Sequence, residues 1–152
     1  SDGDPAEVPQ LEANAALLTE ACPGAVFAAV VEWGAAAAVD AARTSTRLRE
    51  RGFDLILGSD VVYMPQHIPS LAESIAYFLA DSGRALIANT AVATSTTHPA
   101  ARALFLDALQ AAGLDVEVQS LDGVALRNAA GLGISCAPTD YFLTITRRGS
   151  GL

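Results

Sequence analysis

The chain has 152 residues, of which 51% are hydrophobic and 17% charged, and this composition is typical of one globular domain with a sizeable core. The formal net charge is -8, which argues against a nucleic-acid backbone as the main partner because phosphate contacts need clustered Lys and Arg. The apolar runs are shorter than the roughly 20 residues of a membrane span, and the acidic residues 1–9 do not resemble a signal peptide. We therefore expect a cytoplasmic protein without membrane or nucleic-acid partners.

The cysteines and histidines do not suggest a metal centre. Cys22 and Cys136 lie far apart and have no metal-ligand spacing, so free thiols in a reducing compartment are expected. His67 and His98 stand beside prolines without a nearby Cys or His. We therefore expect no metal site.

The first part of the chain predicts a helix and then a strand. Asp4 suits an N-cap and Pro5 the first helical position, and the helix would run to about Glu20. Its expected inner face is Val8, Leu11, Ala15 and Leu18. Residues 25–32 are expected to form a strand, and the alanine-rich residues 35–51 a loop or an irregular helix.

Residues 53–63, FDLILGSDVVY, form the pattern around which we interpret the rest of the chain. The apolar run predicts a strand at about 54–58, buried on both faces as in a parallel sheet covered by helices. Polar residues begin where this strand ends, and the carboxyl ends of such strands carry the ligand crevice in open α/β sheets. Ser59, Asp60 and Tyr63 are therefore the first candidates for a functional site.

Two helices and three strands are expected after this segment. A stripe at helical spacing predicts the first helix, with Ile68, Leu71, Ile75 and Leu79 on its inner face. Residues 81–83 would close this helix, and residues 84–89 would form an apolar strand. Pro99 opens a second helix, which Gly113 ends; its expected inner face is Leu104, Phe105, Ala108 and Ala112.

The order of helices and strands predicts an α/β fold. Alternating patterns predict half-buried strands at 114–121 and 140–147, joined by a glycine-containing loop over 122–138. Continuous burial in the earlier strands and alternation in the last two indicate a mostly parallel sheet with an antiparallel C-terminal edge. One domain would cover residues 1–148, followed by a tail at 149–152.

Five segments of the chain share their pattern with a known family. They are SDGDP at 1–5, VVEWG at 30–34, LILGSDVVY at 55–63, SGRALIA at 82–88 and the terminal strand 141–147. With these segments the chain resembles the seven-strand S-adenosylmethionine-dependent methyltransferases, and within them the methyltransferase-like protein-lysine methyltransferases that act on elongation factor 2, calmodulin and chaperones. The match covers nearly the whole chain, and the combination of EWG with LGSDVVY is fairly specific. The resemblance implies a Rossmann-like fold, S-adenosylmethionine as cofactor and a protein substrate.

The sequence departs from this family at its start. In the family a first strand and a Gly-rich loop precede the acidic end of the second strand, whereas no such loop precedes Asp2 here. We therefore expect the chain to be the C-terminal portion of a larger catalytic domain. A degenerate relative that has lost cofactor binding is the alternative.

The resemblance assigns four residues to the cofactor. Asp2 would accept both ribose hydroxyls, which requires an acceptor-only side chain at a strand end, and Gly3 would allow close approach. Trp33 offers a flat aromatic face for adenine. Ser59 would border the adenosyl group. The alternatives are a helix cap for Asp2, a core or lid position for Trp33 and tight packing for Ser59.

The resemblance also assigns the D-x-x-Y element, Asp60 and Tyr63, to the substrate lysine. A carboxylate orients an ammonium and accepts its hydrogen bonds, while a tyrosine shapes the lysine channel. The alternative is a capped turn with a core tyrosine. Asn89 and Thr90 end the next strand and could border the same site.

The expected function is methyl transfer to a lysine amine of a protein. Two alternatives stay open: a methyltransferase that acts on a small molecule, and a non-catalytic interaction domain that kept the fold. The sequence does not specify the target protein, the target lysine or the oligomeric state.

Overall fold

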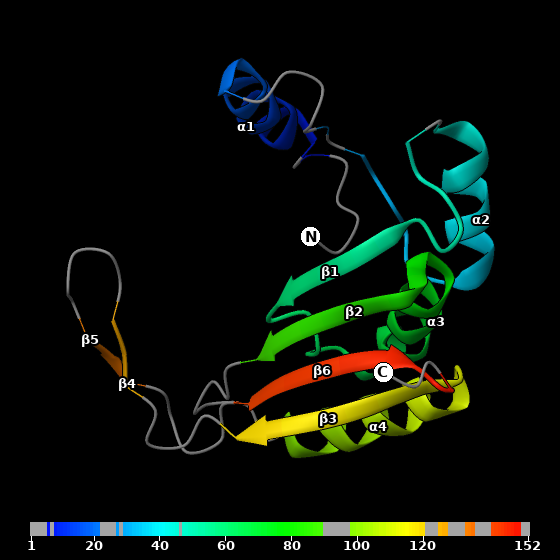
Figure 1. The fold of residues 1–152 in the computed structure, drawn as a ribbon, viewed down its shortest axis with the longest axis vertical. Coiled ribbons are helices and arrows are strands. Elements are labelled where there is room, and N and C mark those ends of the chain that lie inside the picture. The colour runs from blue at the N-terminus through cyan, green and yellow to red at the C-terminus, as the bar shows by residue number, and fades with distance from the viewer. Residues whose placement is uncertain are drawn as a thin grey trace.

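The computed structural model describes residues 6, 8–21, 27, 29–45, 47–89, 98–120, 125–127, 133–135 and 141–149. In chain order the elements are α1 (Val8–Ala21), α2 (Ala35–Thr44), β1 (Phe53–Ser59), the 3-10 turn η2 (Pro65–His67), α3 (Ile68–Phe78), β2 (Leu79–Asn89), α4 (His98–Ala111), β3 (Leu114–Ser120), β4 (Ala125–Arg127), β5 (Gly133–Ser135) and β6 (Tyr141–Arg147) (Figure 1). No helix within these ranges is long and apolar enough to cross a bilayer.

A four-stranded sheet in the order β1-β2-β6-β3 organises the molecule (Figure 1). β1 pairs with β2 in parallel, and β6 pairs antiparallel with both β2 and β3. The first, second and third strands therefore run in one direction, and the C-terminal strand opposes them. The antiparallel strand β6 lies between β2 and β3, so that β1 and β3 are the edge strands of this sheet.

Helices α3 and α4 cover one face of this sheet and form the main core with it. The largest fully buried side chains of this core are Val62, Ile68, Leu79, Ile87, Phe105, Leu109, Leu114, Leu143 and Ile145. The alternating sequence of β6 explains which of its residues belong to the core. Tyr141, Leu143 and Ile145 point to the covered face, while the residues between them are half-buried. The stripe predicted for α3 is fully buried; its last member, Leu79, is the first residue of β2.

The prediction that β1 is buried on both faces is wrong. Leu55 is 50% exposed and Leu57 70% exposed, whereas Ile56 between them packs against the core. The helices α3 and α4 cover only one face, and none of the described helices packs on Leu55 and Leu57. Continuous apolar character in a strand thus predicted the strand but not what covers it.

Four predicted segments differ in the structure. Residues 29–32 belong to no strand, because a strand needs a hydrogen-bonded neighbour and none of the described strands pairs with them. Residues 35–44 form the regular helix α2, where a loop or an irregular helix was expected. Residues 81–83 lie inside β2, where the register with β1 shifts, so they do not close the preceding helix. Within the predicted loop 122–138, β4 and β5 form a two-stranded sheet.

Two of the predicted helix faces also need correction. In α4, Phe105 is buried as expected, but Leu104 is 38% exposed and Leu109 takes its place in the core. The helix ends at Gly113 in the expected left-handed conformation, with φ +78°. In α1, Leu11 of the expected inner face is 41% exposed; Figure 1 shows this helix apart from the sheet.

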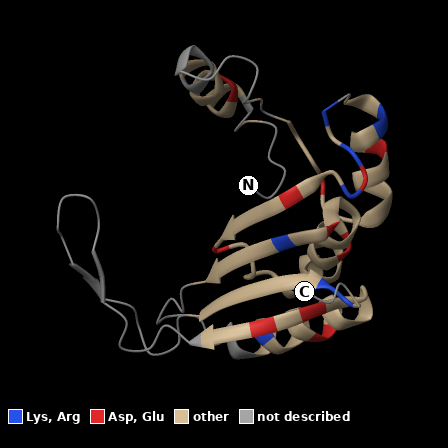
Figure 2. Cartoon of the chain, viewed as in Figure 1, with Lys and Arg blue, Asp and Glu red and all other residues tan. Residues whose placement is uncertain are grey.

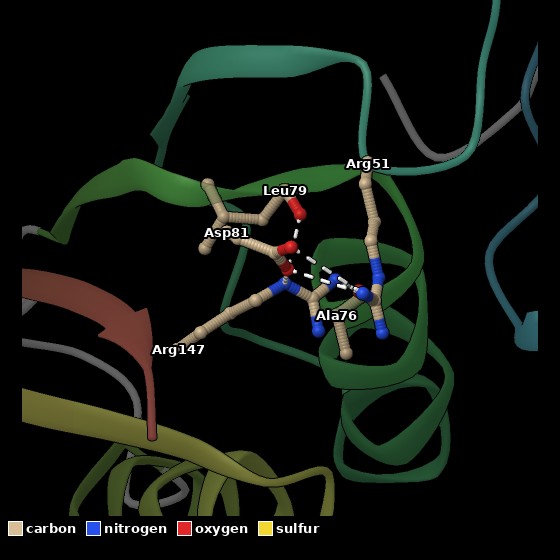
Figure 3. Close-up of polar contacts among 5 residues, drawn as sticks. All are labelled: Arg51, Ala76, Leu79, Asp81 and Arg147. Carbon is tan, nitrogen blue, oxygen red and sulfur yellow. Dashed lines mark hydrogen bonds and ion pairs between the residues drawn. The ribbon is translucent and has the colours of Figure 1, made fainter. Parts of the chain in front are cut away.

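Arg147, at the end of β6, joins three elements at the amino end of the parallel strands (Figure 3). Its Nε donates to the Leu79 carbonyl at 2.9 Å, and its guanidinium also donates to the carbonyl of Ala76 in the last turn of α3. Asp81 lies 3.5 Å from Arg147 Nε and 3.2 Å from Arg51 Nη1. This cluster closes the C-terminal end of α3, whose carbonyls have no partner within the helix.

Candidate functional site

One end of the sheet brings three strand ends together, at the arrowheads of β1 and β2 in Figure 1. They are the carboxyl ends of β1 and β2 and the first residue of β6. The register pairs Ser59 with Ala88 and Asn89 with Tyr141. Since β6 runs antiparallel, its beginning lies beside the end of β2. The sequence therefore brings polar residues that are up to 82 positions apart to the same edge.

Asp60 directly follows β1 and has a left-handed backbone conformation, with φ +52°. Its N–H donates to the Ala88 carbonyl at 2.8 Å, which continues the β1–β2 ladder by one residue. A positive φ is uncommon outside glycine, although Asp and Asn tolerate it best. The conformation turns the chain sharply at the strand end and leaves the Asp60 side chain exposed.

Asn89 holds the loop that contains Asp60 and Tyr63. Its side chain is buried, accepts a hydrogen bond from the Val62 N–H and donates one to the Val62 carbonyl. Val62 lies between the two candidate residues. The sequence suggested Asn89 as a border of the lysine site; its amide is occupied by Val62 instead. Thr90 lies outside the described residues. Tyr63 is 37% exposed, as a residue at the mouth of a site would be.

Tyr141 is a polar residue of this edge that the sequence did not single out. It is 3% exposed, and its hydroxyl has no hydrogen-bond partner in the described part of the chain. The Arg102 guanidinium lies over its ring, 4.8 Å from the centroid. Burial raises the pKa of Tyr141, with the Arg102 cation lowering it and the Asp60 carboxylate raising it. Only the alternation of β6 could have indicated that Tyr141 faces inward.

Trp33 lies in the segment that leads into helix α2. Its side chain packs against the main core and lines a mostly apolar cavity of about 350 Å³. Leu57, Gly58 and Val61, around the end of β1, line this cavity as well, and Ser74 of α3 contributes a hydroxyl to its wall. Phe53, at the amino end of β1, also lines the cavity, which therefore extends along the whole strand. Asp2 and Gly3 lie outside the described residues.

The charges differ between the two ends of β1. Four arginines lie on the end of α2 and in the loop that leads into β1, where Figure 2 shows blue segments: Arg43, Arg47, Arg49 and Arg51. Asp60 follows the carboxyl end of β1. The described basic residues of this loop therefore lie at the edge opposite to the candidate site. No group of three or more potential metal ligands occurs within the described ranges.

The family described as lysine methyltransferase matches residues 1–110, which include Trp33, Asp60 and Tyr63. The chain belongs to this family. The methyltransferases of this class use S-adenosylmethionine as methyl donor. A comparison with curated protein sequences gives no match.

One solved structure of another protein shares the fold, and a second shows a weaker similarity. The fibrillarin pre-rRNA processing protein of Methanococcus jannaschii is similar with a TM-score of 0.50 and 15% identity, over 87% of this chain and 50% of that protein. A putative DNA modification methylase of Thermus thermophilus, in complex with S-adenosyl-L-methionine, has a TM-score of 0.45 and 13% identity, over 68% and 49%. The chain thus spans about half the length of these structures. The expected α/β, Rossmann-like methyltransferase fold is confirmed.

The described residues fit the adenine end of S-adenosylmethionine. The Trp33 side chain gives the cavity an aromatic wall, and flat aromatic rings stack on such a surface. The cavity volume falls within the roughly 300–1,000 Å³ of small-molecule pockets, and the lining is mostly apolar with a hydroxyl from Ser74. Ser59 follows the cavity-lining Gly58 and is exposed at the strand end.

Proposed function

We propose that this chain forms part of an S-adenosylmethionine-dependent protein-lysine N-methyltransferase, with Asp60 and Tyr63 on the side of the substrate lysine. The placement of Asp60 carries this proposal. Its carboxylate is exposed at the carboxyl end of β1, its backbone is fixed to Ala88, and it lies close to the aromatic-walled cavity. The match of the lysine methyltransferase family over residues 1–110 supports the choice of substrate.

Asp60 and Tyr63 would position the amine for transfer. A free lysine amine has a pKa of about 10.4 and is protonated at neutral pH, whereas nucleophilic attack needs the neutral amine with its lone pair directed at the methyl group. The Asp60 carboxylate would accept hydrogen bonds from the amine and orient it. Tyr63, which is 37% exposed and follows three residues later, would shape the lysine channel and hydrogen-bond the nitrogen. Catalysis would then depend on orientation and desolvation more than on covalent chemistry.

The cofactor side would be formed by Trp33 and Ser59 together with Asp2 and Gly3. S-adenosylmethionine supplies, when bound, a methyl group attached to a sulfonium. Trp33 would stack on the adenine, and Ser59 would border the adenosyl group at the end of β1. Asp2 would accept the ribose hydroxyls, with Gly3 allowing close approach.

Transfer of a labelled methyl group tests the proposal. The protein is incubated with methyl-labelled S-adenosylmethionine and a cell lysate, and the protein fraction is hydrolysed to amino acids. We expect label in methylated lysine, and no such label when Asp60 is replaced by Asn. Label confined to small molecules or to nucleic acid would contradict the lysine assignment. Calorimetry with S-adenosylhomocysteine tests the remaining alternative, a non-catalytic domain. Absence of binding would favour that alternative.

A further inference from the structure

The turn after Trp33 is fixed by two side chains of helix α3. The N–H of Gly34 donates to Ser74 Oγ at 2.8 Å, and the N–H of Ala35 donates to Glu73 Oε2 at 3.0 Å. Gly34 has φ +127° and ψ 152°, a conformation that is essentially restricted to glycine. The backbone next to the only tryptophan of the 152 residues is thus held in an unusual conformation by another element.

These hydrogen bonds replace an ordinary helix cap. The first N–H groups of α2 have no partner inside the helix, and such groups are commonly capped by a side chain just before it. Gly34 has no side chain to do this, and α3 supplies the acceptors instead. The Glu73 carboxylate also lies at the positive end of the α2 dipole. The start of α2, and Trp33 with it, is therefore tied to α3.

Ser74 links this turn to the cavity. It is 6% exposed and lines the same cavity as Trp33. Loss of its hydroxyl would leave the Gly34 N–H without its partner and would free the turn to shift. Since Trp33 immediately precedes Gly34, a shift of the turn would move the aromatic wall of the cavity.

We propose that Ser74, assisted by Glu73, is a positioning residue that fixes Trp33 against the adenine of the cofactor. This inference rests on the proposed function, in which Trp33 stacks on adenine. Neither side chain needs to touch the reacting atoms, so their loss weakens cofactor binding rather than methyl transfer itself. Changes in Ser74 raise KM for S-adenosylmethionine and leave kcat at saturating cofactor within about twofold.

The experiment compares Ser74→Ala with Ser70→Ala in the 152-residue chain. Ser70 is a matched control, because it lies on the same helix with its Oγ 3.8 Å from where a Gly34 Cβ would be and forms no hydrogen bond with the residues that the structure describes. Trp33 fluorescence and calorimetry follow the binding of S-adenosylhomocysteine. We expect the Kd to rise about tenfold in Ser74→Ala, as loss of a partly buried hydrogen bond implies, and to stay within about twofold in Ser70→Ala.

A second pair of variants tests the inference even if Ser74→Ala does not fold. Glu73 is exposed, so Glu73→Ala leaves the core intact, and Glu73→Gln keeps an oxygen that accepts from Ala35. We expect weaker binding in Glu73→Ala and recovery in Glu73→Gln. Equal affinities of Ser74→Ala and Ser70→Ala, or of both Glu73 variants and the wild type, overturn the inference while the proposed function stands. A wild-type chain that does not bind S-adenosylhomocysteine overturns both.

Discussion

The side-chain amide of Asn89 forms two hydrogen bonds with the backbone of Val62: Oδ1 accepts from the Val62 N–H at 3.3 Å, and Nδ2 donates to the Val62 carbonyl at 3.1 Å. Asn89 is 2% exposed and Val62 fully buried. The last residue of β2 thereby fixes the middle of the loop that contains Asp60 and Tyr63. An amide does this better than a carboxylate, which could not donate to the carbonyl.

Asn89→Ala is expected to lower the free energy of unfolding by about 2–4 kcal/mol, because two buried backbone groups of Val62 lose their partner. Methylation should also fall, since the loop with Asp60 and Tyr63 loses its anchor. Urea unfolding measures the first effect, and activity per folded molecule the second. Asn14→Ala, on the exposed face of α1, is the control and should change stability by less than about 0.5 kcal/mol. An Asn89→Ala protein as stable as the wild type would show that the amide does not hold the loop.

Asp60→Asn should abolish methylation without loss of stability. Asn has the same shape and tolerates a positive φ, so that the turn after β1 stays intact while the charge is lost. We expect activity to fall by about 100-fold or more, with S-adenosylhomocysteine affinity unchanged. Asp60→Gly should give the same loss, because glycine adopts this φ without strain.

Asp54→Asn is the matched control for Asp60. Asp54 is an exposed carboxylate on the same strand, β1, but far from its carboxyl end. Methylation should remain near the wild-type rate in this variant. Normal turnover in both Asp60 variants would remove Asp60 from the substrate site and leave the fold and the cofactor side untouched.

Local patterns in the sequence predicted the main elements correctly. Ile68, Leu71 and Ile75 recur at helical spacing and are buried in α3, and the alternating residues 141–147 form β6. The resemblance identified the family from segments such as LGSDVVY. These signals are contained within a few turns or one strand, so they do not depend on what the segment packs against.

Features that depend on distant partners could not be predicted in this way. The apolar Leu57 has the character of a core residue, yet its side chain is 70% exposed. The Asn89–Val62 bonds join residues 27 positions apart, and the Gly34–Ser74 bond joins residues 40 positions apart. No spacing rule connects such pairs, because tertiary packing alone brings them together. The same holds for Tyr141, which the antiparallel β6 places beside Asn89 at the end of β2.

Arg147→Met should destabilise the protein without affecting the site. The guanidinium is 18% exposed and donates to the carbonyls of Leu79 and Ala76 at the end of the sheet opposite to Asp60 (Figure 3). Hydrogen bonds of charged groups contribute about 1.5–3 kcal/mol, and we expect a loss of this order in urea unfolding. The activity per folded molecule should stay unchanged.

Arg148→Met provides the comparison for Arg147. Arg148 forms an exposed ion pair with Asp115, with Nε 3.2 Å from Oδ1. Exposed pairs contribute about 0–1 kcal/mol, so the loss should be clearly smaller than for Arg147. If both variants lost the same stability, Arg147 would not be the residue that closes the end of α3.

Tyr141→Phe should leave stability at pH 7 unchanged or slightly higher, because it removes a buried hydroxyl that has no partner among the described residues and keeps the ring beneath Arg102. Burial raises the pKa of Tyr141 above its ordinary value of 10.0, so the unfolded chain ionises this phenol at a lower pH than the folded protein does. Above about pH 10 the folded state holds more protons, and stability falls as pH rises until the folded pKa is passed.

The stability of the wild type relative to Tyr141→Phe is therefore constant below about pH 10 and falls above it. Urea unfolding of both proteins between about pH 7 and 11 isolates this contribution, since the other titrating groups are common to the two. The wild type should lose more stability than Tyr141→Phe above about pH 10, and the two curves should run parallel below it. A marked destabilisation of Tyr141→Phe at neutral pH would mean instead that the hydroxyl is paired in solution, and parallel curves over the whole range would mean that the phenol is not buried.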